Sequence, residues 1–253
     1  MINEIYLKKF FQRDQIPHYP CPRCGAHMKS ELSAEEDRAY SKQYSHIDGY
    51  SHDDEESIFH IKLECTHPKC GEPVFLVGKG TVAYEDFLDE DGNLDLEYIT
   101  YFEPKFFIPN LCIFNIPKKT PYRVTQSVIA SFNLFFISSN SALNEIRNAV
   151  EFLMDELKVP RLGSSTEDPD VKVRWDLDTR VGKLTGEHRK YKSNLQAIKN
   201  LGNLGSHAAE TTRDDVLNAY KILHYVLDGI YDQRDQHVTD LTRKIKADKR
   251  TEI

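Results

Sequence analysis

The spacing of apolar residues changes partway along this chain, from a two-residue period to a helical one. In "SIFHIKLEC" (57–65) and "PVFLVG" (73–78), apolar and polar residues alternate, as they do in half-buried strands. From Thr125 onward, apolar residues recur three and four positions apart, which is the period of an amphipathic helix. The sequence therefore predicts a first part with strands and a second part built from helices.

Five helices are expected in the second part. Pro160 ends the second of them, because proline cannot continue a helix. Thr212 followed by Asp215 marks the start of the last helix, as in a capping box. Helices of this number and spacing favour a bundle. The segments expected to be helical are 124–138, 140–160, 176–188, 191–200 and 211–233.

The segment 99–124 separates the two parts. It carries Pro104, Pro109, Pro117 and Pro121, with aromatic and aliphatic residues between them. Prolines at this density exclude a helix and favour extended chain. A free linker would be polar, so we expect this segment to be an apolar connector that packs across the helical part.

Four of the five cysteines form two pairs, in "CPRCG" and "CTHPKCG". Each pair lies in a short turn that ends in glycine, which is the form of a zinc knuckle. Two knuckles joined by strands describe a zinc ribbon with Cys21, Cys24, Cys65 and Cys70 as ligands. Four protein ligands leave no position for water, so the expected zinc is structural.

Two alternatives to this ligand set stay open. The gap between Cys65 and Cys70 is four residues rather than the usual two, so His67 or His27 can replace one thiolate. A disulfide framework is the other alternative, but it is disfavoured in a cytosolic chain. Cys112 stands alone in "NLCIFNIP" and is interpreted as a small buried hydrophobic residue.

The predicted fold class is α+β: a small N-terminal zinc ribbon with short antiparallel strands, followed by an all-α helical bundle. The expected domains are a zinc ribbon over 1–98, a proline-rich apolar connector over 99–124 and the helical bundle over 125–253. The end of the chain, 239–253, is mildly basic. It is interpreted as a frayed helix end and a weak candidate for nucleic-acid contact.

Charge is concentrated in one stretch of the predicted ribbon. Of the 253 residues, those from 31 to 60 hold nine carboxylates and two basic residues, which accounts for the whole net charge of −7. We interpret this stretch as a solvated acidic insertion. A phosphate backbone would be repelled only locally, so nucleic-acid binding elsewhere is not excluded.

The sequence predicts neither a membrane protein nor a secreted one. No run approaches the roughly 18 apolar residues that a membrane span needs. The first residues, "MINEIYLKKFFQRDQ", carry charges where a signal peptide has its apolar region. The expected location is therefore cytoplasmic, with no membrane partner.

Two charged residues stand on an otherwise apolar helix face. Arg147 and Glu151 are four residues apart and share that face with Leu143, Val150 and Met154. Burying either charge alone costs several kcal/mol. They are interpreted as an ion pair that fixes helix packing or a dimer seam, or as a site in which Arg147 faces an anion.

The segment "AIKNLGNLGSHAAE" (197–210) places two glycines around an asparagine, just before a histidine. A glycine costs a helix about 1 kcal/mol relative to alanine. Glycines near a helix end also permit left-handed angles and close approach. This backbone lets Asn203 and His207 turn inward, either as part of a site or as a structural latch between helices.

Three segments, "SALNEIRNAVEFLMDEL", "LDTRVGKL" and "LQAIKNLGNLGSHAAE", resemble a known family over about residues 100–232. It is the uncharacterised domain found with type I restriction subunits and other prokaryotic defence genes, often preceded by a cysteine ribbon. The family is placed in the HEPN superfamily of helical bundles. The resemblance implies a HEPN-like bundle, a homodimer through the helical domain, and RNA or a defence protein as partner.

The resemblance also implies a metal-independent ribonuclease site. Its most specific part is a basic residue, then Gly-Asn, then histidine, which here are Lys199, Gly202, Asn203 and His207. His207 would move the proton of a ribose 2′-hydroxyl or of the leaving oxygen. Lys199 and Arg147 would bind phosphate, while Asn203 positions the substrate and Glu151 lies beside them.

This chain departs from the catalytic pattern in one respect. The family's active members have an arginine four to six residues before the histidine, whereas seven residues separate Lys199 from His207. Lysine also lacks the bidentate fork of arginine. The alternative function is therefore a non-catalytic module that binds a protein or nucleic-acid partner through the ribbon or the acidic insertion.

Overall fold

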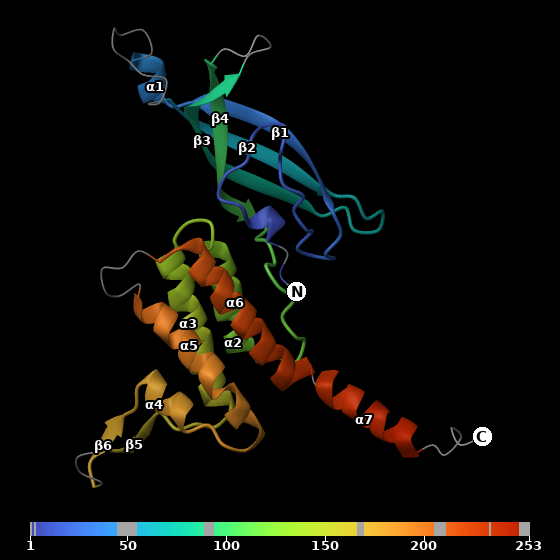
Figure 1. Ribbon diagram of the computed structural model, residues 1–253, viewed down its shortest axis with the longest axis vertical. Helices are drawn as coiled ribbons and strands as arrows, with labels where there is room; N and C mark the ends of the chain where they lie inside the picture. The colour runs from blue at the N-terminus through green and yellow to red at the C-terminus, as the bar shows by residue number, and fades with distance from the viewer. Residues whose placement is uncertain are drawn as a thin grey trace. The chain divides into compact units, whose positions relative to one another are not determined.

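The computed structural model describes residues 2, 4–44, 55–88, 94–165, 170–204, 211–232 and 234–247. The chain divides into a sheet unit, Ile2–Ile113, and a helical unit, from Phe114 onward (Figure 1). An antiparallel sheet followed by helices confirms the predicted α+β class. No helix among the described residues is long and apolar enough to cross a membrane.

The sheet unit is built on four antiparallel strands in the order β1-β2-β3-β4. They form a curled sheet, with β2 and β3 in its middle (Figure 1). Short strands are the expectation from sequence, but β3 and β4 contain 16 and 15 residues because their pairing continues well beyond the cysteine turns. The elements are η1 (Ile5–Leu7), β1 (Met28–Asp37), α1 (Ala39–Tyr44), β2 (Glu56–Cys65), β3 (Pro73–Leu88) and β4 (Leu94–Ile108).

One face of the sheet carries the core of this unit. Phe59, Ile61 and Leu63 alternate along β2 and are fully buried, as the two-residue period requires. The chain before β1 covers this face. Phe11 stacks on Phe102 of β4 with ring centroids 5.6 Å apart, and the backbones of these two residues also hydrogen-bond to each other.

Both ends of the acidic stretch lie in strands of the sheet. Residues 31–37 lie in β1 and 56–60 lie in β2. Several of their carboxylates bind cations of neighbouring segments: Arg13 binds Glu35, and Arg38 binds Glu56. Glu35, Glu36 and Asp37 are consecutive in β1, so the acidic residues of this strand lie on both faces of the sheet. Residues 45–54 lie outside the described part of the chain.

The predicted domain boundary at residue 98 falls inside β4, so the structure corrects it. The sheet unit continues to Ile113, and the first ten residues of the predicted connector are strand. Pro104 is tolerated there because β4 is an edge strand and the β3–β4 register shifts beside Val77 and Gly78. Proline occurs in sheets at such edges and bulges.

Gly78 is a close-contact position at this register shift. A Cβ atom on Gly78 would lie 2.2 Å from the carbonyl oxygen of Glu103 and 2.5 Å from the ring of Phe59. Both neighbours are fixed in the sheet, so Gly78→Ala is expected to destabilise the sheet unit by about 1–3 kcal/mol, as overpacking does. Chemical denaturation would measure this change.

The matched control for Gly78→Ala is Lys79→Ala at the next position. Lys79 is exposed and forms a surface ion pair with Glu56 at 3.6 Å, and such pairs contribute about 0–1 kcal/mol. Equal stability losses in the two variants would contradict the close-contact role of Gly78.

The helical unit contains the five predicted helices with two differences. The third is divided into α4 and η3, and α5 continues through Gly202. Thr212 and Asp215 form the predicted capping box. The basic end of the chain contributes to a 14-residue helix, α7, and a small hairpin, β5–β6, was not expected. The elements are α2 (Tyr122–Leu134), α3 (Ser139–Glu156), β5 (Leu162–Ser164), β6 (Lys172–Arg174), α4 (Leu177–Gly182), η3 (Gly186–Tyr191), α5 (Lys192–Leu204), α6 (Arg213–Leu227), η4 (Asp228–Asp232) and α7 (Arg234–Ala247).

The core of the helical unit lies between α2, α3, α5 and α6 (Figure 1). One face of α3 lies in this core, since Ala142, Ile146, Ala149 and Leu153 are all fully buried. One hydroxyl pair, Ser131 and Tyr220, is also buried here with oxygens 2.7 Å apart. The helices therefore form a continuous apolar interior that fixes the side chains on their outer faces.

Candidate functional sites

The two cysteine pairs come together in the sheet unit. The Sγ atoms of Cys21, Cys24, Cys65 and Cys70 all lie within 4.8 Å of one another. The Sγ–Sγ distances are 3.7 Å for Cys21–Cys70 and 3.5 Å for Cys24–Cys65. A tetrahedral metal with bonds of about 2.3 Å to four sulfurs separates those sulfurs by about 3.8 Å. The cluster is therefore of the size that one metal ion requires.

Each cysteine pair is held by a turn that ends in a left-handed glycine. Gly25 (φ +73°) donates its N–H to the carbonyl oxygen of Cys21 at 2.8 Å. Gly71 (φ +58°) follows Cys70, whose N–H donates to the carbonyl oxygen of His67 at 2.9 Å. Positive φ favours glycine, so the glycines of "CPRCG" and "CTHPKCG" are explained by the local backbone.

The surroundings of the thiols differ. A hydrogen bond from the backbone N–H of Ala26 lowers the pKa of Cys24. Burial raises the pKa of Cys65 to about 12. A bound cation would supply the positive charge that keeps both as thiolates, so the donor set fits a metal better than it fits four free thiols.

The histidine alternatives are not supported by the geometry. His67 lies beside Cys70, but its Nδ1 accepts a hydrogen bond from the N–H of Lys69 at 3.3 Å. The ring of His27 packs edge-on against that of His18, with centroids 4.4 Å apart. Neither imidazole belongs to the cluster of four sulfurs.

The fifth cysteine corrects an expectation. Cys112 is exposed rather than buried, because it lies in an extended segment whose neighbours Leu111 and Ile113 point inward. Its Sγ donates to the carbonyl oxygen of Pro22 at 3.6 Å. Cys112 is thus close to the first cysteine turn without being one of the four clustered thiols.

In the helical unit, Glu151 is bound by an arginine that sequence reasoning did not select. Arg180 of α4 is only 1% exposed, and its Nη1 donates to the carboxylate of Glu151. Its Nη2 donates to Asp155 Oδ1 at 2.7 Å and to the carbonyl oxygen of Val159 at 3.0 Å. Glu151 thus has a partner in Arg180 that the sequence interpretation did not include, while its pairing with Arg147 and its place in a site stay predictions.

A second arginine completes this ion network. Arg161 donates from Nε to Asp155 Oδ1 at 2.9 Å and from Nη2 to Oδ2. The hydrogen bonds from Arg161, together with those from Arg180, lower the pKa of Asp155. A signal for Arg180 existed in "LDTRVGKL", since it stands on the same helix face as the buried Leu177 and beside the buried Val181.

Arg147 and Lys199 approach the start of α4 from two other helices. Lys199 Nζ lies 3.4 Å from Asp178 Oδ1. The pKa of Asp176 is lowered by the backbone N–H of Thr179 and, to a smaller extent, by the positive charges of Lys199 and Arg147. Two of the predicted phosphate ligands thus share one electrostatic environment.

The remaining predicted residues of this site are described in part or not at all. Asn203 follows Lys199 by one turn of α5, but its side chain lies outside what the structure describes. His207 falls in the segment 205–210, which is likewise outside the described residues. The structure therefore places the two cations and leaves both the catalytic and the latch interpretations of Asn203 and His207 as predictions.

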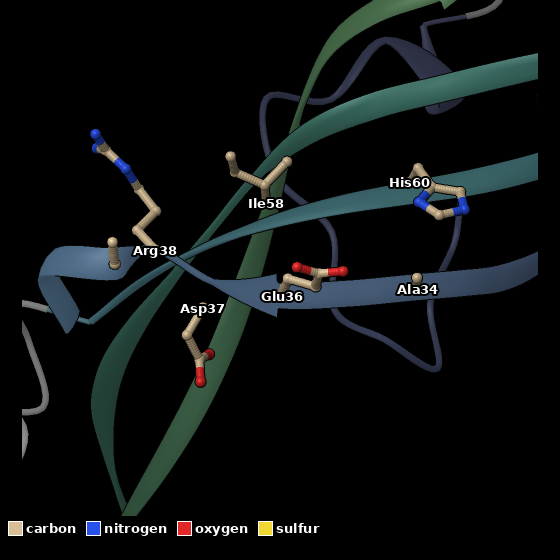
Figure 2. Close-up of a pocket in the computed structure, with 7 residues that line it drawn as sticks. Ala34, Glu36, Asp37, Arg38, Ile58 and His60 are labelled. Carbon is tan, nitrogen blue, oxygen red and sulfur yellow. The ribbon is translucent and has the colours of Figure 1, made fainter. Parts of the chain in front are cut away.

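A separate hollow of about 450 Å³ lies on the outer face of the sheet, at the β1–β2 end. Figure 2 shows Glu36, Ile58 and His60 on one side of the sheet and Asp37 on the other. The Arg38 side chain at its rim is bound to Glu56. The charged and polar residues that line the hollow are Glu36, Asp37, Arg38 and His60, and we assign it no chemistry.

The two units match two different family models. Residues 9–107 match a domain of unknown function (DUF8608), and residues 130–248 match another domain of unknown function (DUF4145). Searches among curated proteins and among solved structures found no match. The matched ranges follow the division of the chain into its sheet and helical units.

Proposed function

We propose that this protein acts on RNA through its helical unit, as a metal-independent ribonuclease of a prokaryotic defence system. The proposal is carried by Lys199 of α5 and Arg147 of α3: both charges act on Asp176 at the start of α4, and Lys199 Nζ lies 3.4 Å from Asp178 Oδ1. Cations from two helices at one place suit a phosphate, whose charge grows during cleavage. In this proposal the helical unit is a HEPN-like bundle that works as a homodimer in the cytoplasm.

In the proposed reaction two cations bind the RNA, and Asn203 and His207 then act on the bound phosphate and its neighbouring groups. Arg147 and Lys199 bind a phosphate of the RNA, and Asn203, one turn beyond Lys199, positions it. His207 takes the proton of the adjacent 2′-hydroxyl or protonates the leaving 5′-oxygen. The product is a 2′,3′-cyclic phosphate. Glu151, which Arg180 binds, has no assigned step in this reaction.

The metal of the sheet unit is proposed to be a structural zinc ion, which makes this unit a zinc-ribbon domain. Thiolates select soft metals, and four sulfurs in tetrahedral spacing suit zinc. Cys21, Cys24, Cys65 and Cys70 would hold it. With all four positions filled by protein, the ion contributes to folding rather than to the RNA chemistry.

The second candidate is a non-catalytic adaptor that binds a protein or nucleic-acid partner in the same kind of defence system. The pairing of Lys199 with Asp178 at 3.4 Å favours it, because the carboxylate partly neutralises the cation that would bind phosphate. The two candidates differ in whether RNA is cut.

The test is RNA cleavage by the purified protein with and without EDTA. Ribonuclease function predicts cutting that resists EDTA and leaves 2′,3′-cyclic phosphate ends. His207→Ala is expected to lower the rate by about 10²–10⁴-fold, which is the usual contribution of a general acid or base. Lys199→Ala is expected to lower it as well, while Lys172→Ala, at an exposed position of β6, leaves it unchanged.

Folding of each variant is checked by circular dichroism. Intact RNA after incubation with the wild-type homodimer would reject the ribonuclease in favour of the adaptor. Equal cleavage by wild type and folded His207→Ala would reject the assignment of His207. Loss of cleavage in EDTA that returns with zinc would show that the metal does more than stabilise the sheet unit.

A further inference from the structure

The hairpin of β3 and β4 extends beyond the rest of the sheet. β2 pairs with β3 only as far as Thr81, whereas β3 and β4 stay paired up to Leu88 and Leu94. Residues 83–88 and 94–99 therefore form a two-stranded ribbon, which we call the β-ribbon. Within the described part of the chain no further strand pairs with it, and a two-stranded ribbon is marginal in water by itself.

One face of the β-ribbon is apolar and uncovered. Tyr84 lies on the face of β3 that carries the buried Leu76, and Leu96 and Tyr98 lie on the face of β4 that carries the buried Phe102. The core-forming face of the sheet thus continues onto the β-ribbon. There Tyr84, Leu94, Leu96 and Tyr98 are all more than half exposed. Contiguous exposed apolar side chains of this kind mark an interaction surface.

The β-ribbon is also uniformly acidic. Glu85, Asp86, Asp95 and Glu97 are all exposed, and the sequence has no lysine or arginine between residues 80 and 104. Asp86 stands on the apolar face, directly opposite Leu96. A partner must therefore combine an apolar stripe with basic residues beside it.

Helix α7 has this combination. Val238, Leu241 and Ile245 fall on one side of the helix at spacings of three and four, and they are 43–67% exposed. At 100° per residue, Lys244 and Lys246 flank this stripe on opposite sides. The stripe and its two lysines complement the β-ribbon in both polarity and charge.

We propose that the β-ribbon of one copy of this chain binds α7 of a second copy, and that the contact is made twice in a two-fold dimer. Tyr84, Leu96 and Tyr98 cover the apolar stripe of α7, while Asp86, the carboxylate on the same face, lies against the flanking lysines. Two-fold symmetry repeats the contact and doubles the buried area. This surface involves neither Arg147 nor Lys199, so the inference goes beyond the RNA function and does not depend on it.

A charge exchange between two variants tests the contact. One variant carries Lys244→Glu with Lys246→Glu, and the other carries Asp86→Lys. In the homodimer of either variant, like charges face each other at both contacts. The dissociation constant of that homodimer, measured by sedimentation equilibrium, is therefore expected to rise at least tenfold. A mixture of the two restores opposite charges at both contacts and is expected to form a heterodimer as tight as the wild-type dimer.

The control is Lys172→Glu with Arg174→Glu on β6, which makes the same charge change at exposed positions and leaves the dimer intact. The substituted residues are solvent-exposed, so all variants keep the wild-type circular dichroism spectrum. A monomeric wild type, variants that dimerise as tightly as the wild type, or a mixture without a heterodimer would each overturn the proposal. RNA cleavage is measured separately, and neither result decides the other.

Discussion

Cys65→Ser is expected to abolish metal binding and to cause the largest loss of stability of any single change in the sheet unit. The four sulfurs join the chain before β1 to the β2–β3 turn. In small zinc domains the metal contributes about 10 kcal/mol or more of folding free energy, whereas whole domains are stable by about 5–15 kcal/mol. Loss of one ligand is therefore expected to lower the melting temperature of this unit by more than about 10 °C.

Two measurements check this prediction. Elemental analysis is expected to fall from one zinc per chain to less than a tenth of that value. Hydrogen exchange is expected to lose protection in β1 to β4 while α2, α3 and α6 stay protected, because the helical unit has its own core. Treatment of the wild type with a strong chelator should reproduce both changes.

Cys112→Ser is the matched control, because Cys112 is exposed and lies outside the cluster of four sulfurs. It should keep one zinc per chain and the wild-type melting temperature. A folded Cys65→Ser variant that still binds one zinc would show that another group, such as His67, completes the site.

The cysteine site could be predicted from the sequence because its determinants are local. Each pair lies within one short turn, and Gly25 and Gly71 occupy the positive-φ positions that such turns need. The two-residue period of β2 likewise identified Phe59, Ile61 and Leu63 as one face. What local pattern could not supply is the length of β3 and β4, which depends on pairing between distant segments.

The ion network around Arg180 in the helical unit, by contrast, could not be predicted from local sequence. Glu151 is close to Arg147 in sequence, but it is also bound by Arg180, which is 29 residues away. The arginine reaches it only because α4 packs against the end of α3, so helix periodicity alone cannot identify the pair. Arg180 had a sequence signal, a charge on a buried helix face, yet the signal does not name the carboxylates that bind it.

Arg180→Met is expected to destabilise the helical unit by about 3 kcal/mol or more, as the loss of one partner from a buried ion network does. Methionine replaces most of the apolar stem but removes the donor to Glu151 and to the carbonyl oxygen of Val159, and it leaves Asp155 with Arg161 alone. The folded-state pKa of Asp155 lies below its ordinary value of 3.8. The stability contributed by this carboxylate is therefore present above about pH 4 and is lost as the pH falls through the folded-state pKa.

Urea unfolding of Arg180→Met between pH 3 and pH 7 measures both effects. The difference from wild type should be constant above about pH 5 and should shrink towards pH 3, where protonation of Asp155 removes part of the interaction in the wild type as well. Arg161→Met is the control, because Arg161 binds the same carboxylate but is 44% exposed. Exposed pairs contribute about 0–1 kcal/mol. Equal losses in the two variants would show that burial of Arg180 adds nothing, and a stable Arg180→Met variant would show that α4 is held by its apolar residues alone.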